Sequence, residues 1–204
     1  QHDAEKLFHQ YFSLFDQQWY EMQDRYRPGD ELLQVVRSVV PTSCRMSRSN
    51  KWFHVQPANA PITTQGWKIH ISATPANCES ILGIVARICY ENDTAFKFTV
   101  DRRFVTLMLS KIWGREGSGK FITVYPHNDD HFREIIELFY TALEGFDAPY
   151  ILSDRRYKDS QTVYYRYGGI SGLNILTLSG DRSFMLKAPD GTLVPDWRTP
   201  YWNP

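Results

Sequence analysis

The sequence lacks a surplus of charge of either sign. Its 204 residues include 23 Lys and Arg against 23 Asp and Glu, so the formal net charge is +0. Binding to nucleic acid through charge alone needs surplus cations, because the affinity comes from the counterions that they displace. The balance therefore argues against a histone-like or tail-driven nucleic-acid binder, although a local basic pocket remains compatible with it.

Long apolar runs are also missing. No stretch approaches the roughly 18 to 20 apolar residues that are needed to span a bilayer. The first residues, QHDAEKLFHQYF, have neither the basic end nor the apolar stretch of a signal peptide. We therefore expect a soluble, cytoplasmic protein that has no membrane partner.

Cysteine is scarce, with three residues that are far apart: Cys44, Cys78 and Cys89. This set forms neither a disulfide framework nor a zinc-binding motif. We expect three free thiols, with Cys78 and Cys89 buried in an apolar helical pattern, and no catalytic cysteine. The run HNDDH, residues 127–131, contains metal-ligand types, but Asn and Asp before an apolar periodic segment are typical of a helix start, so we predict no metal site.

Aromatic residues are abundant at 15%, which excludes a disordered chain. Apolar periodicity predicts helices over 4–25, 31–39, 75–90 with Thr74 as cap, and one that Asp129 or Asp130 caps and Gly145 closes. Alternation predicts strands over 66–72 and 95–100, and strands are also predicted over 52–55, over the β-rich run 121–125 and over 162–167. Residues 101–112 fit either a helix capped by Asp101 or a buried strand. Helices that alternate with strands predict an α/β or α+β domain.

The segment GREGSGK, residues 114–120, matches the spacing of a phosphate-binding P-loop. Two features argue against that function. Phe121 occupies the position of the magnesium-binding Ser or Thr, and the β-rich run FITVY follows instead of a helix whose N-terminus would hold phosphates. We expect a flexible loop in which Arg115 and Lys120 are still available to an anion.

Three basic side chains are predicted to share one face of a sheet. Lys68 and His70 alternate with apolar residues in GWKIHIS, and Lys97 alternates likewise in AFKFTV. If both strands place their apolar side on one core, the basic side chains meet on the opposite face. Arg166 and Tyr125 are candidates to join them from other strands. A simply solvated strand face would give the same alternation.

Six separated blocks occur in order: WKIH, FKF, GSGKFITVYP, PYILSDRR, VYYRYGG and DGTLVPDWRTPYW. Together they resemble the N-terminal lyase domain of class III lanthipeptide synthetases, which is similar to the phosphothreonine lyases injected by pathogenic bacteria. The resemblance runs from about Trp67 to the C-terminus and, more loosely, over the leading helix. It implies a phosphothreonine-lyase-like α+β fold, with a mostly antiparallel sheet packed with helices.

The resemblance also implies a reaction, the β-elimination of phosphate from phosphoserine or phosphothreonine in a precursor peptide. The product is dehydroalanine or dehydrobutyrine, and neither a metal nor an organic cofactor is needed. Lys97 matches the base that removes the α-proton, His70 matches the acid that protonates the leaving oxygen, and Lys68 matches the lysine beside it.

The phosphate-binding positions are assigned in the same way. Arg115 and Arg166 match phosphate-contacting residues of the family. Lys120 is added because of its charge, and Tyr125 because of its strand. Such cations suit the chemistry, because they keep a desolvated lysine unprotonated, hold the phosphate, and neutralise charge that builds on the carbonyl. The bound phosphate would in turn raise the pKa of His70 from about 6.5 and leave it protonated.

We expect residues 1–204 to form a single lyase domain, with 1–40 as a helical lead-in and 66–204 as the core. Class III synthetases continue into kinase and cyclase-like domains, but this sequence has no His-Arg-Asp or Asp-Phe-Gly signature and no zinc-binding Cys/His set. The expectation is a domain excised from a lyase-kinase-cyclase synthetase, or a lyase that receives phosphopeptide from a separate kinase.

Two other functions are compatible with a basic pocket. A phosphopeptide-binding module would recognise phosphate without turnover. Nucleic-acid binding through aromatic and basic residues is disfavoured by the charge balance, so we expect no nucleic-acid partner.

Overall fold

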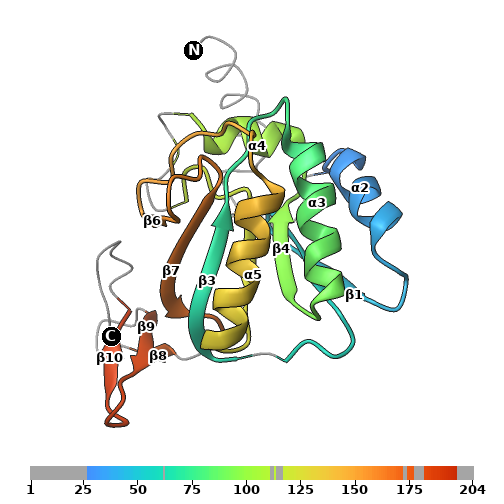
Figure 1. Ribbon diagram of the computed structural model, residues 1–204. Helices are drawn as coiled ribbons and strands as arrows, with labels where there is room; N and C mark the ends of the chain where they lie inside the picture. Colours follow the sequence, from blue (N-terminus) through green and yellow to red (C-terminus); the bar gives the residue numbers. More distant parts are fainter. Residues whose placement is uncertain are drawn as a thin grey trace, which may run out of the picture.

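A seven-stranded sheet lies at the centre of the protein, and Figure 1 shows how the elements of this computed structural model are arranged. The structure describes residues 27–61, 63–110, 113, 117–171, 174–176 and 182–196. The strand order is β1-β2-β4-β5-β3-β7-β6, and every neighbouring pair is antiparallel. The strands are β1 (Arg45–Ser49), β2 (Trp52–Gln56), β3 (Gln65–Ile71), β4 (Ala95–Thr99), β5 (Ile122–Tyr125), β6 (Arg155–Arg156) and β7 (Val163–Gly169).

Helices cover one face of this sheet. Helix α3 (Cys78–Glu91) and helix α5 (Asp129–Ala142) lie across it, and α2 (Glu31–Val39) lies beside α3 (Figure 1). Alternate residues of the central strands face these helices and form the core with them, among them Ile69, Ile71, Phe96, Phe98, Ile122 and Val124. The residues between them therefore point to the opposite face. Antiparallel strands with helices on one side make this an α+β fold, as expected.

A small second sheet follows β7. It has the order β10-β9-β8 and consists of β8 (Asn174–Leu176), β9 (Arg182–Lys187) and β10 (Leu193–Pro195). Strand β9 contacts β7, and the backbone N–H of Gly169 donates to Asp196 Oδ2 at 3.1 Å. These contacts place Phe184 of β9 beside the open face of the main sheet.

Most predicted elements are confirmed to within two residues. The alternating segments are strands β2, β3, β4, β5 and β7, and the helix over 31–39 begins and ends as predicted. The ambiguous segment after β4 is helix α4 (Arg102–Met108), because Asp101 caps it by accepting a hydrogen bond from the Phe104 N–H at 2.9 Å. All three cysteines are free and buried, as expected.

Two helix starts differ from the prediction. The cap of α5 is Asn128, whose side chain accepts from the His131 N–H at 2.8 Å, and not Asp129 or Asp130. Helix α3 begins at Cys78, because residues 75–77 form a turn. Thr74 still serves this end of the helix, since its hydroxyl accepts from the Asn77 N–H at 3.2 Å.

One prediction lies outside the described residues, namely the helix over 4–25. None of the helices that the structure describes is long and apolar enough to cross a membrane.

Candidate active site

Lys97 and His70 lie in one row across the open face of the sheet. Lys97 of β4 pairs with Thr123 of β5, and Thr123 pairs with His70 of β3. Paired residues of neighbouring strands point to the same face, and strands are about 4.8 Å apart. The backbones that carry the lysine and the histidine are therefore about 10 Å apart, with the small side chain of Thr123 between them.

Other polar residues lie on the same face of the sheet as this row. Lys68 is two residues before His70 and pairs with Arg166 of β7. Tyr125 is two residues after Thr123 on β5. Lys68 and Tyr125 share the face of the row, because side chains two apart on a strand point the same way. Arg166 shares it because paired residues of neighbouring strands point to the same face.

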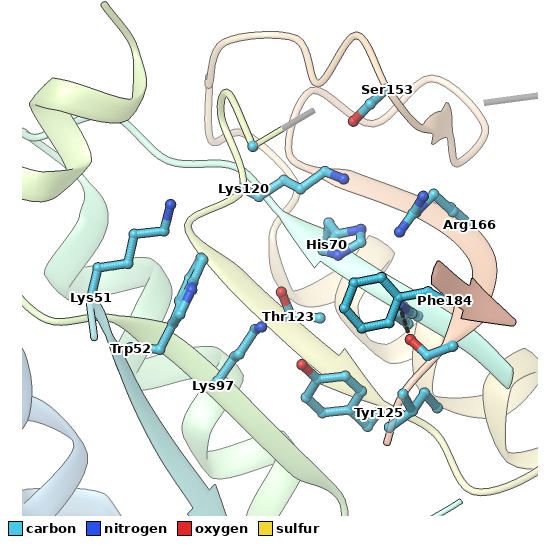
Figure 2. A pocket seen from close by; sticks show the side chains of 14 residues that line it. Lys51, Trp52, His70, Lys97, Lys120, Thr123, Tyr125, Ser153, Arg166 and Phe184 are labelled. Atoms are coloured by element: carbon cyan, nitrogen blue, oxygen red, sulfur yellow. Dashed lines mark hydrogen bonds between the residues drawn. The ribbon is translucent and has the colours of Figure 1, made fainter. Parts of the chain in front are cut away.

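These side chains line a pocket of about 310 Å³, seen in Figure 2. The described residues that line it are Lys51, Trp52, Lys68, His70, Lys97, Gly117, Lys120, Thr123, Tyr125, Ser153, Arg166, Gly169, Ile170 and Phe184. Counting Lys and Arg and leaving His70 aside, five of these residues are basic, and no lining residue among those described is acidic. Such a wall attracts a multiply charged anion and repels metal cations.

A buried carboxylate organises one side of the pocket. Asp154 Oδ2 bonds to Nδ1 of His70, and its Oδ1 forms an ion pair with Lys120 Nζ at 2.9 Å. The Ser153 hydroxyl donates to the same oxygen at 2.9 Å. Burial would raise the pKa of Asp154, but the hydrogen bond from His70 and the ammonium group of Lys120 outweigh burial and hold that pKa well below its usual range. The carboxylate fixes both partners in the pocket wall.

His70 has a lowered pKa. Burial is the main cause and brings the pKa to about 3, while Asp154 opposes this change and Lys120 and Arg166 add to it. The imidazole is therefore neutral in the empty pocket. Because Nδ1 faces Asp154, Nε2 is the ring nitrogen available to a ligand.

Lys97 lies among aromatic rings. Its Nζ is 4.7 Å from the ring centre of Trp52 and 6.0 Å from that of Tyr125. Burial raises the pKa of Tyr125, so its hydroxyl stays protonated and can donate a hydrogen bond. Figure 2 shows Lys97 between these rings, on the side of Thr123 away from Lys120 and Arg166.

Lys68 and Arg166 complete the opposite wall. Lys68 Nζ donates to the backbone oxygen of Gly169 at the end of β7. Gly168 leaves room for this lysine, since a Cβ there would lie 3.4 Å from Nζ and 3.3 Å from Asp196 Oδ2. Arg166 Nε is buried and has no hydrogen-bond partner among the described residues. A buried donor without a partner is costly, which indicates a place for an acceptor from a ligand.

Among the described residues of the segment 114–120, which matches the spacing of a P-loop, Lys120 lines the pocket. Gly119 has φ = 76°, a conformation that glycine adopts easily, and the chain turns there before Lys120 enters the pocket. Buried Phe121 and strand β5 follow, as the sequence predicted. In the part of the chain that the structure describes, a strand and not a helix follows this loop, unlike in a P-loop.

Six of the seven predicted site residues line the pocket, and Arg115 lies outside the described residues. Sequence reasoning missed Asp154, Trp52, Lys51, Thr123, Ser153 and Phe184. Asp154 lies inside the block PYILSDRR, where a carboxylate between an apolar segment and two arginines was the available signal. Trp52 was assigned to a strand without a role.

The sequence matches the family described as RamC, N-terminal domain, over residues 32–204. It is 40% identical over 166 residues to a probable SapB synthase of Streptomyces coelicolor, a match that covers 81% of this chain and 18% of that protein. The chain thus spans less than a fifth of that relative's length.

The fold is similar to that of solved phosphothreonine lyases. The type III effector/phosphothreonine lyase OspF from Shigella flexneri superposes with a TM-score of 0.50 at 18% identity, covering 81% of this chain and 87% of that one. A mutant of the Salmonella plasmid virulence C protein, SpvC, gives a TM-score of 0.50 at 15% identity, covering 83% and 89%. At such identities the likeness establishes a common fold.

Proposed function

This chain belongs to the RamC N-terminal domain family, and we propose that it is a lyase domain of a lanthipeptide synthetase that β-eliminates phosphate from phosphoserine or phosphothreonine. The observation that carries the proposal is the row of Lys97, Thr123 and His70 within a pocket that has five basic residues. With the amine of Lys97 and the imidazole of His70 two strands apart, one can take the proton from Cα of a substrate residue while the other gives a proton to the oxygen that leaves Cβ.

Lys97 is the proposed base. Its uncharged amine takes the α-proton, the electron pair of that C–H bond forms the Cα=Cβ double bond, and the Cβ–O bond breaks. His70 gives a proton from Nε2 to the departing oxygen, so the products are a dehydroamino acid and hydrogen phosphate. Lys97 ends protonated and His70 neutral, and a proton exchange with solvent restores both.

The remaining cations bind the phosphate. Arg166 offers its buried Nε, and Lys120 and Lys68 offer charge from either side of His70. We also assign Arg115 to this group on the family resemblance, and Tyr125 as a neutral donor. A phosphomonoester carries about −1.5 to −2 charges at pH 7, which offsets these cations and raises the pKa of His70 when substrate binds. Binding of the substrate would thereby favour the protonated form of His70, which is the form that can act as the acid.

A mass measurement tests the proposal. When the protein is incubated with a peptide that contains phosphoserine, it should release phosphate and leave a dehydroalanine residue. The mass of the product peptide should then be lower than that of the unphosphorylated peptide by one water molecule. A restored serine hydroxyl would mean a phosphatase. Binding without any product would support the rival function, a phosphopeptide-binding module.

Lys97→Ala separates the lyase from the binding module. We expect elimination to fall by about 10²- to 10⁴-fold while phosphopeptide affinity stays measurable, because the phosphate is held by other residues. Lys187→Ala is the matched control, since that lysine is exposed and does not line the pocket. Equal elimination by both variants would contradict the role of Lys97.

The proposal includes a source of substrate. We infer that a kinase, in the same synthetase or separate, phosphorylates a precursor peptide and that a cyclase uses the dehydrated product. We also place the reaction in the cytoplasm, where three free thiols persist. No metal, organic cofactor, nucleic acid or membrane has a part in the proposed reaction.

A further inference from the structure

A second pocket adjoins the first on the far side of Lys97 from His70. Its volume is about 250 Å³, and it shares Lys97, Tyr125 and Ile170 with the first pocket. The register explains this position, because Lys97 pairs with His54 of β2 on one side and with Thr123 on the side of His70. Lys97 therefore stands at the boundary between two hollows on one sheet face.

The two pockets differ in chemistry. The first has five basic residues in its wall, whereas the second has mostly apolar surface, including Pro61, Ala95 and Ile170. Lys97 is the one Lys, Arg, Asp or Glu among the described residues that line the second pocket. Burial lowers the pKa of His54, and its Nε2 lies 2.8 Å from the Ser49 hydroxyl oxygen.

The position of the base fixes which part of a substrate reaches the second pocket. This step rests on the proposed function. An amine that removes an α-proton must lie within hydrogen-bond reach of it, so the Cα of the phosphorylated residue sits at Lys97. Its phosphate extends toward His70 and Arg166. The main chain leaves the same Cα in two directions, and the hollow that opens beside Lys97 is the second pocket.

We propose that the second pocket is a specificity subsite for an apolar side chain on the residue directly before or after the phosphorylated Ser or Thr. Such a side chain would cover carbon-rich surface at Ala95, Pro61 and the ring of Tyr125. A carboxylate there would lose its water and meet one lysine that, as the base, carries no charge. The substrate class is thus a phosphopeptide with an apolar neighbour at the phosphorylated position.

Two sets of three phosphopeptides, each set differing at one position, test this subsite. They carry Leu, Gly or Asp beside the same phosphoserine, once before it and once after it, and kcat/KM for elimination is measured for each. We expect Leu to exceed Gly by about tenfold or more on one side of the phosphoserine, with Asp no better than Gly. The side that responds identifies the direction in which the peptide lies.

A variant that fills the pocket tests the location. Thr63→Phe places a ring in the lining, and it should bring the Leu-to-Gly ratio of kcat/KM close to one. Thr63→Ser is the matched control and should keep the ratio, because it leaves the space open. Ser171→Phe, at an exposed position of the same lining, is the second variant if Thr63→Phe does not fold.

The outcomes separate this inference from the proposed function. Elimination from all peptides at equal rates would overturn the subsite and leave the lyase intact. A preference for Leu that Thr63→Phe and Ser171→Phe do not change would place apolar recognition elsewhere and also overturn it. No elimination from any peptide would overturn both.

Discussion

At the scale of single residues, the site depends on one carboxylate. Asp154 is buried and holds His70 and Lys120 at once, so it decides which ring nitrogen faces the substrate and where one phosphate ligand lies. His70, the proposed general acid, is uncharged before substrate binds, since burial keeps its pKa low. Asp154 does not contact the reacting atoms and acts as a positioning residue.

Asp154→Asn should impair catalysis more than binding. The amide keeps the shape but no longer accepts from both partners, and an orienting carboxylate of this kind contributes about 10²- to 10⁴-fold to kcat. The measurement is kcat and KM for elimination over a range of pH. The part of the pH profile of kcat that reflects protonation of His70 should shift. Asp130→Asn, at an exposed pair with Arg133, is the control. Unchanged kcat and an unchanged pH profile in Asp154→Asn would remove Asp154 from the mechanism.

At the scale of secondary-structure elements, strand alternation separates the core from the chemistry. Strands β3 and β4 give their apolar residues to α3 and α5, and their basic residues to the pocket. A shift of one residue in either strand would exchange the two faces, so the packing of the helices also fixes the register of the site. Helix α5 covers β3, and its start is fixed by the Asn128 cap.

Asn128→Ala should therefore destabilise the protein by about 1 kcal/mol, because the His131 N–H loses its acceptor. The free energy of unfolding in urea measures the change. Asp130→Ala, which removes an exposed carboxylate of the same turn, should cost less. A larger loss in Asp130→Ala would identify the aspartate as the effective cap.

At the scale of the whole molecule, burial keeps several histidines neutral. The folded state therefore loses stability when the pH falls. The pKa values of His54, His70 and His131 are all lowered, with burial as the largest cause. In the unfolded chain they titrate near 6.5, so between that pH and their folded pKa the unfolded state binds more protons. Stability from this source is complete above about pH 6.5 and is lost as the pH falls.

The free energy of unfolding should accordingly decrease from pH 7.5 to pH 5, by up to about 1.4 kcal/mol per pH unit for each such histidine. Urea unfolding at a series of pH values measures it. His70→Gln should flatten the slope, since the pKa of His70 is lowered to about 3. Lys187→Gln is the control, because that exposed side chain lies outside the pocket. An equal slope in both variants would mean that His70 is protonated when folded.

The sequence by itself predicted five strands of the main sheet, the helix over 31–39 and the basic face, because alternation in GWKIHIS and AFKFTV is a local property of strands. It also carried the family resemblance in its ordered blocks. Only the tertiary structure decided that Lys97 and His70 share one row, since β5 lies between β4 and β3 although it follows both in the chain. The same holds for Asp154, which is 84 residues from His70, and for the second pocket. Strand order and long-range contacts depend on how the whole core packs, and no local pattern encodes that packing.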